Sequence, residues 1–218
     1  MGEDQYPLPD EIADDYAKAE GLRLKGAYDD ARAIVESLLE RYPEHPKLWN
    51  CLGSICFSEG DYERAEELFQ KTLYFAPHNP KVYNNLSRTY RNLGETQKSA
   101  EYARRAIRLE PKSPRSWNTL GLFYVDKGEL EIAVDYFIAA YYCDADELEA
   151  AFNAACALCQ LGETEDALRF LEKSLEHEFF LGYALKDETL DPLRGHPEFE
   201  RLIAEATGRF GNSKNAGN

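Results

Sequence analysis

Histidine and cysteine, the side chains that most often act as catalytic bases, nucleophiles or metal ligands, are few in this 218-residue chain and lie mostly far apart. The sequence contains no Gly-rich phosphate loop, no nucleophile elbow and no His-Glu-x-x-His pair. We therefore predict a protein that is not an enzyme, with no catalytic residue, no metal site and no cofactor. The four histidines are His45, His78, His177 and His196.

The five cysteines contain one local pattern of this kind, the C-x-x-C formed by Cys156 and Cys159. This pair falls inside a predicted helix, and no second pair or nearby histidine completes a metal site. Packing within the helix is the favoured interpretation, and a redox or metal-binding role is the alternative. An odd number of cysteines in a chain with enough apolar residues for a core indicates a reducing compartment.

Side chains suited to molecular recognition recur at one fixed interval. Lys47 and Lys81 are 34 residues apart, and so are Asn84 and Asn118. Lysine and arginine bind carboxylates, and an asparagine side chain offers a donor and an acceptor to a peptide backbone. The elements that position these side chains must therefore repeat with the same period.

Glycine recurs with this 34-residue period and divides the chain into five repeats. Apolar residues such as Trp49, Leu52 and Cys56 lie three and four apart, which is helical spacing. We expect each repeat to form two helices, with glycine ending the first and proline often stopping the second. The phased glycines are Gly26, Gly60, Gly94, Gly128 and Gly162, and the repeats are 12–45, 46–79, 80–113, 114–147 and 148–181.

The repeat resembles the tetratricopeptide repeat (TPR), a helix-turn-helix unit. The resemblance implies an all-α fold, a right-handed α-solenoid of five TPR hairpins that binds proteins or peptides in a concave groove. The first and fifth repeats depart from the pattern, with Asp15 in place of an apolar residue and Ala151 in place of tryptophan. The residues that carry the resemblance are Trp49, Leu52, Gly53, Ala65, Phe69 and Pro77 in the second repeat, and Trp117, Leu120, Gly121, Tyr124, Ala133 and Phe137 in the fourth.

The two ends of the chain fall outside the repeats. Residues 1–11 form an N-terminal leader. Residues 182–207 resemble the closing segment of many bacterial TPR proteins, and we expect capping helices that cover the apolar face of the fifth repeat. Residues 208–218 are small and polar, which predicts a disordered tail.

The TPR resemblance implies that the first helix of each repeat lines the groove, and this selects the candidate binding residues. Basic residues would attract an acidic peptide or terminal carboxylate, and asparagines would bind its backbone. The aromatic residues Tyr16, Phe57 and Phe152 would supply apolar anchors. The alternative is a solvated polar face whose asparagines bond only within or between repeats. The predicted peptide-binding residues are Lys47, Asn50, Phe57, Lys81, Asn84, Asn85, Arg88, Arg91, Arg115 and Asn118.

Charge separates the third repeat from the rest of the chain. The whole protein has a net charge of −15, whereas residues 80–113 contain eight basic and three acidic side chains. An acidic protein or peptide is therefore the expected partner. Nucleic acid is disfavoured, because its binding needs a dominant positive field.

The sequence thus predicts a non-catalytic interaction scaffold or adaptor. Two alternatives remain: the chain is the substrate-recruiting TPR region of a larger enzyme, or it is a self-assembling homo-oligomer. No apolar run reaches membrane-spanning length, and the N-terminus lacks an export signal, so we expect a cytoplasmic protein. Loss of an N-terminal signal from a longer natural chain would instead place it in the periplasm or on a membrane.

Overall fold

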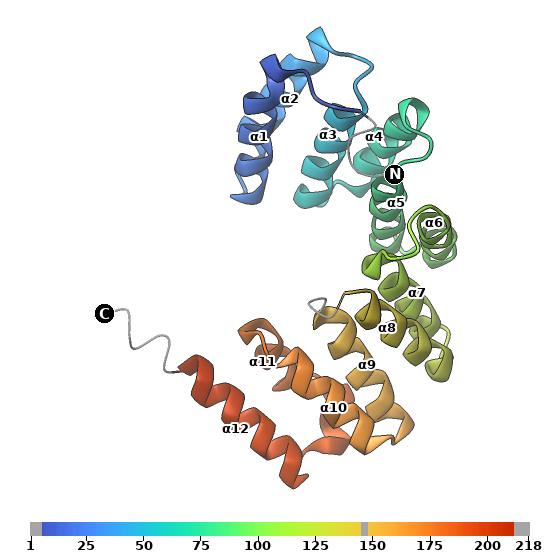
Figure 1. Ribbon diagram of the computed structural model, residues 1–218, viewed down its shortest axis with the longest axis vertical. Helices are drawn as coiled ribbons and strands as arrows, with labels where there is room; N and C mark the ends of the chain where they lie inside the picture. Colours follow the sequence, from blue (N-terminus) through green and yellow to red (C-terminus); the bar gives the residue numbers. More distant parts are fainter. Residues whose placement is uncertain (1–5, 145–147, 212–218) are drawn as a thin grey trace. The chain divides into compact units, whose positions relative to one another are not determined.

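The computed structural model describes residues 6–144 and 148–211, and helices dominate both segments (Figure 1). These segments contain twelve α-helices, one 3-10 helix and no β-strand. The all-α class and the helical-hairpin repeat of the predicted solenoid are therefore confirmed. The chain divides into two compact units, Met1–Pro111 and Lys112–Asn218.

The first unit contains three helical hairpins. Each odd-numbered helix packs on the even-numbered helix that follows it, and α3 also contacts α1 and α5. The second helix of one hairpin packs on the first helix of the next, so the hairpins share a continuous apolar core. The helices are α1 (Asp10–Leu24), α2 (Tyr28–Arg41), α3 (Pro46–Glu59), α4 (Tyr62–Phe75), α5 (Pro80–Asn92) and α6 (Thr96–Leu109).

Turn residues fix where these helices begin and end. Gly60 follows α3 with a φ of 88°, a left-handed conformation that is costly for residues with a side chain. Asp61 then caps α4, because its carboxylate accepts a hydrogen bond from the backbone N–H of Arg64. Pro46 and Pro80 occupy the first turns of α3 and α5, where a missing N–H leaves no helical hydrogen bond unmade.

The second unit adds a closing segment to two further hairpins. Helices α7 and α8 form one hairpin, and α9 and α10 form the next. After them η1 packs on α9, while α12 contacts α10 and α11. The elements are α7 (Pro114–Asp126), α8 (Leu130–Cys143), α9 (Leu148–Leu161), α10 (Thr164–Ser174), α11 (Glu178–Ala184), η1 (Glu188–Leu193) and α12 (Pro197–Gly211).

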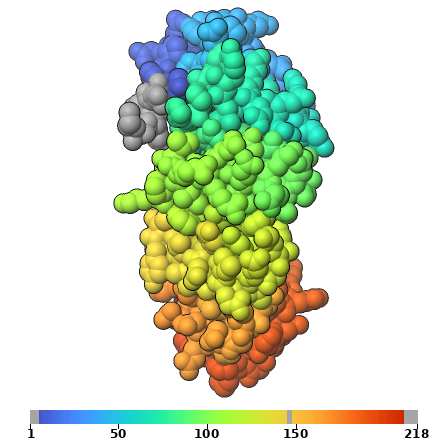
Figure 2. Space-filling view, turned by 90° about the vertical axis from the view of Figure 1, so that its right-hand side faces the viewer, coloured from blue at the N-terminus to red at the C-terminus, as the bar shows by residue number. Residues whose placement is uncertain are grey.

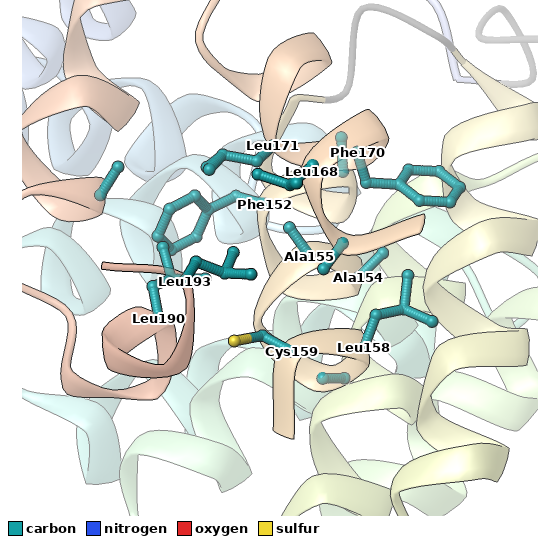
Figure 3. Packing of buried hydrophobic residues seen from close by; sticks show 14 of the residues in the cluster. Phe152, Ala154, Ala155, Leu158, Cys159, Leu168, Phe170, Leu171, Leu190 and Leu193 are labelled. Carbon is teal, nitrogen blue, oxygen red and sulfur yellow. The ribbon is translucent and has the colours of Figure 1, made fainter. Parts of the chain in front are cut away.

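The core of the second unit extends from the hairpins into the closing segment. Leu190 and Leu193 of η1 are buried beside Phe152 and Cys159 of α9 (Figure 3). In the space-filling view, the colour bands within each unit follow one another in chain order, as expected when the hairpins of one unit pack on each other (Figure 2). The closing segment therefore removes apolar surface of the last hairpin from water.

The C-terminal helix is longer than the sequence indicated. Residues 208–211 were predicted to belong to a disordered tail, but α12 continues to Gly211. Phe210 packs against the core cluster of the second unit, and a guanidinium nitrogen of Arg209 donates to the carbonyl oxygen of Leu175 at 3.4 Å. These two contacts explain the extra turn. Residues 212–218, the rest of the predicted tail, lie outside the described residues.

In two hairpins a glycine of one helix faces an aromatic ring of the other at close range. A Cβ on Gly53 of α3 would lie 2.8 Å from the ring of Phe69 on α4. A Cβ on Gly121 of α7 would overlap the ring of Phe137 on α8. Both phenylalanines are only 1% exposed, so neither ring has free space into which it can move.

We predict that Gly121→Ala destabilises the protein by about 1–3 kcal/mol, because the added methyl overpacks the α7–α8 contact. Thermal and urea unfolding followed by circular dichroism measure the effect. Gly182→Ala is the matched control, because a Cβ on Gly182 of α11 meets nothing within 4 Å. The control is expected to leave stability unchanged or to raise it by up to about 1 kcal/mol through helix propensity. Equal stability of the two variants would contradict the proposed contact.

Candidate functional site

The structure places the ten predicted binding residues in two groups. Eight of them lie on α3 and α5 of the first unit, and we refer to these eight as the α3–α5 surface. Arg115 and Asn118 lie on α7 in the second unit. The residues of the α3–α5 surface are Lys47, Asn50, Phe57, Lys81, Asn84, Asn85, Arg88 and Arg91.

An amide bridge joins the two helices of this surface. The side-chain amide of Asn85 donates to the side-chain carbonyl of Asn50 at 3.0 Å. Both side chains are half-buried, and the described residues provide no further partner for Asn50 Nδ2 or Asn85 Oδ1. The bridge therefore fixes the two amides and leaves the side-chain nitrogen of Asn50 as a donor and the side-chain oxygen of Asn85 as an acceptor.

The second unit repeats this bridge in a more buried form. Asn153 of α9 donates to the side-chain oxygen of Asn118 at 2.9 Å, and Asn118 in turn donates to Glu149 at 3.3 Å. These contacts leave Asn118 only 6% exposed. At this position the asparagine bonds between repeats, which is the alternative that the sequence left open.

Asn153 was not among the predicted residues. A signal for it was present, because Asn153 and Asn85 are two repeat lengths apart and occupy the same place in their repeats. Each donates to the asparagine that lies 35 residues earlier in the chain. The amides therefore pair across successive repeats, the fifth residue of one repeat with the sixth residue of the next. This pairing is visible in the sequence only when the repeats are aligned on both positions.

Helix α5 supplies the positive charge of the α3–α5 surface. Lys81, Arg88 and Arg91 are exposed, and the helix contains no acidic residue. The Arg88 guanidinium lies 4.7 Å from the ring centroid of Phe57 on α3, a cation–π contact. Phe57 also meets the edge of Tyr62 with a centroid distance of 5.3 Å. The stack restrains Arg88, while the N–H donors of its guanidinium lie in the plane of the group.

Of the three aromatic residues expected to anchor a ligand, Phe152 is not available. It is 6% exposed and packs against Phe180 and Tyr183 of α11, with centroid distances of 5.6 and 6.1 Å. Tyr16 and Phe57 are half-buried. Phe152 was misassigned because α11, which covers it, straddles the end of the fifth repeat and the closing segment, and the repeat pattern does not specify its packing.

Three tetratricopeptide repeat family models match the chain, at residues 16–80, 56–123 and 114–147. The chain belongs to the tetratricopeptide repeat family. TPR proteins are generally non-catalytic scaffolds that bind protein or peptide partners. A comparison with curated protein sequences gives no match.

Solved TPR structures resemble the chain in fold. PilF of Pseudomonas aeruginosa has a TM-score of 0.68 and 20% identity, over 90% of this chain and 98% of its own. MamA has a TM-score of 0.62 and 22% identity, over 76% and 96%. YrrB, a TPR protein described as having an unusual peptide-binding site, has a TM-score of 0.56 and 19% identity, over 90% and 92%. At these identities the likeness shows the shared fold alone.

The cysteine thiols of this TPR protein take part in packing and are not activated as nucleophiles. All five are free thiols, and Cys51, Cys56 and Cys159 are buried. Burial raises the pKa of Cys51, and it raises the pKa of Cys156 to about 12. The Cys156 thiol lies 3.9 Å from a carboxylate oxygen of Asp187. At neutral pH these thiols are protonated and hence weakly nucleophilic.

Residues 6–144 and 148–211 contain neither a cluster of metal ligands nor a membrane-spanning helix. No group of three or more His, Cys, Asp or Glu side chains in the described part of the chain is arranged to hold a metal ion. No described helix is both long enough and apolar enough to cross a lipid bilayer.

We predict that thiol ionisation weakens this TPR protein in alkali. The unfolded chain has thiol pKa values of about 8.5, whereas burial holds the pKa of Cys156 near 12. The Cys156 thiol therefore stays protonated to a higher pH in the folded state than in the unfolded state. The free energy of unfolding consequently falls as the pH rises from about 8.5 to about 12. Removing the thiol in Cys156→Ala should make that fall shallower by at most about 1.4 kcal/mol per pH unit.

Urea unfolding between about pH 9 and pH 11 tests this expectation. Cys156→Ser is the matched variant, because it also removes the titrating thiol but replaces sulfur with a hydroxyl. The two variants should differ in absolute stability and share the shallower slope. If the free energy of unfolding falls with pH as steeply in both variants as in the wild type, ionisation of Cys156 does not contribute to the loss of stability.

Proposed function

We propose that this TPR protein is a non-catalytic scaffold whose α3–α5 surface binds an acidic peptide or an acidic segment of a partner protein. The observation that carries the proposal is the charge of α5, which contains three basic residues and no acidic one in a chain of net charge −15. A basic surface on an otherwise acidic protein attracts acidic ligands selectively and repels basic ones.

The spacing of the basic residues suits an extended ligand. Lys81, Arg88 and Arg91 follow at intervals of seven and three residues, which places them along one side of the helix. At about 1.5 Å per helical residue, Lys81 and Arg91 are separated by about 15 Å along the axis. An extended peptide covers that length with about four or five residues, so carboxylates near both ends of such a segment would each meet a cation.

The amide bridge supplies the groups that can hold the backbone of the peptide. Asn50 retains its side-chain donor and Asn85 its side-chain acceptor, as the described residues leave both available. A peptide unit offers the complementary acceptor and donor. Because the bridge fixes both side chains, little further ordering is needed when the ligand binds. Lys47, half-buried at the start of α3, extends the positive charge toward this pair.

The test uses charge reversal on the proposed surface. We expect Lys81→Glu with Arg88→Glu to weaken partner binding by at least about tenfold per residue, since hydrogen bonds to charged groups contribute about 1.5–3 kcal/mol each. Wild-type and variant proteins would be used to capture partners from the source cells at moderate salt. The affinity of the captured partner would then be measured by titration, and it should fall as ionic strength rises.

The matched control is Arg105→Glu with Arg108→Glu on α6, which changes the net charge by the same amount in the same hairpin. Arg105 pairs with Glu101 at 2.6 Å on that helix, and such exposed pairs contribute little to stability. The control should bind as the wild type does. Equal capture by all three proteins would move the site away from the α3–α5 surface. Loss of binding in both variants would indicate a general charge effect.

A further inference from the structure

A pocket of about 520 Å³ lies at α11 and the turn that follows it, in the second unit. Its lining combines two aromatic rings with a glycine and two charged side chains. The glycine contributes space, because a Cβ on Gly182 would meet nothing within 4 Å. The lining residues are Phe179, Gly182, Tyr183, Lys186 and Asp187.

The aromatic part of this pocket is both exposed and well supported. Phe179 and Tyr183 are 57% and 51% exposed, and their ring centroids are 4.9 Å apart. Phe180 and the buried Phe152 pack against the pair from the protein side. Adjacent Leu185 is 48% exposed. A supported aromatic surface that stays exposed is typical of an interaction site, since an anchor on the partner could bury it at low entropic cost.

Charge around the pocket selects the kind of partner. The second unit carries 20 acidic and 10 basic side chains. Glu176 and Glu178 precede Phe179 in the chain, and Glu188 follows Asp187, whereas Lys186 is the one basic residue of the lining. A second copy of this chain would bring the same acidic side chains against each other, which is unfavourable.

One carboxylate of the pocket is held in a fixed position. Asp187 accepts hydrogen bonds from the backbone N–H and the hydroxyl of Thr189, at 2.9 and 2.7 Å. Both bonds go to the same oxygen, Oδ1, while Oδ2 lies near the Cys156 thiol. An ordered carboxylate beside an aromatic wall is suited to a lysine or arginine whose neighbours in sequence are apolar.

We propose that the α11 pocket docks a basic segment of a partner protein through an apolar or aromatic anchor. The site goes beyond the acidic-peptide surface of the first unit and does not depend on it. A scaffold with both sites would bind two partners of opposite charge. The anchor would pack on Phe179 and Tyr183 over Gly182, while flanking lysine or arginine residues would meet Asp187 and the neighbouring glutamates.

The binding test uses two synthetic peptides that share a Leu-Trp-Leu core, one flanked by lysines and the other by glutamates. Fluorescence anisotropy of each labelled peptide is measured at moderate salt with the whole chain carrying Lys81→Glu and Arg88→Glu, which removes the acidic-peptide site proposed for the first unit. We expect the lysine-flanked peptide to bind at least about tenfold more tightly than its glutamate-flanked counterpart. Equal binding of the two peptides, or no binding of either, would overturn the proposal.

Two variants locate the binding. Gly182→Leu fills the pocket in a helix that has room for the side chain, and Phe179→Ser removes half of the aromatic wall. Each should weaken binding of the lysine-flanked peptide by about tenfold or more. Gly182→Leu is expected to keep wild-type stability in circular-dichroism melts, so it tests the site even where Phe179→Ser is poorly folded.

The control is Tyr142→Ser, which removes a tyrosine that is 77% exposed on α8 of the same unit. This variant should bind both peptides as the wild type does. Unchanged binding of the lysine-flanked peptide by Gly182→Leu would mean that the acidic surface attracts the peptide elsewhere, and the α11 site would be rejected. Failure here leaves the first unit's charge-reversal result unaffected, so the two sites are tested separately.

Discussion

The contact between a glycine of one helix and an aromatic ring of its partner sets the spacing within two hairpins, α3–α4 and α7–α8, and other features depend on it. At Gly53 and Gly121 the absence of a side chain lets Phe69 and Phe137 reach the opposite backbone. With the second helix held this close, its remaining apolar side chains pack against the next hairpin. The first helices are consequently brought within hydrogen-bond distance of one another, and their outer faces become a surface on which ligand-binding side chains can be arranged.

The amide bridges show how one side chain can serve structure and binding together. An asparagine has four hydrogen-bonding positions, and a bridge to the next repeat uses only one on each partner. In the first unit, Asn50 and Asn85 stay half-buried after bridging. In the second unit, Glu149 joins the pair and Asn118 becomes buried. The same residue type at the same place in the repeat is therefore half-buried in one unit and buried in the other, and its neighbours decide which.

Much of the fold follows from local sequence, whereas side-chain exposure does not. The phased glycines, the proline starts and the aspartate cap each act over a few residues, so the sequence is sufficient to predict hairpins at their positions. The burial of Phe152 depends on Phe180 and Tyr183 of α11, a helix that straddles the end of the fifth repeat. The end of α12 depends on Phe210 reaching a core built largely by other helices. The pairing of Arg88 with Phe57 joins two repeats and has no signature in either alone. Contacts between helices, rather than local turn and cap signals, therefore set the limit of what the sequence predicts.

These contacts join residues about one repeat length apart in the sequence, and this separation has an evolutionary consequence. The bridges Asn50–Asn85 and Asn118–Asn153 both join residues 35 positions apart, and within each unit a hairpin packs on the next one. Duplication or loss of one whole 34-residue segment therefore preserves every type of contact that the remaining hairpins make, whereas a shorter insertion would put glycines and aromatic rings out of register. A chain of this kind can change its length by unequal recombination, and a duplicated hairpin can then acquire new surface charges while its buried face stays the same.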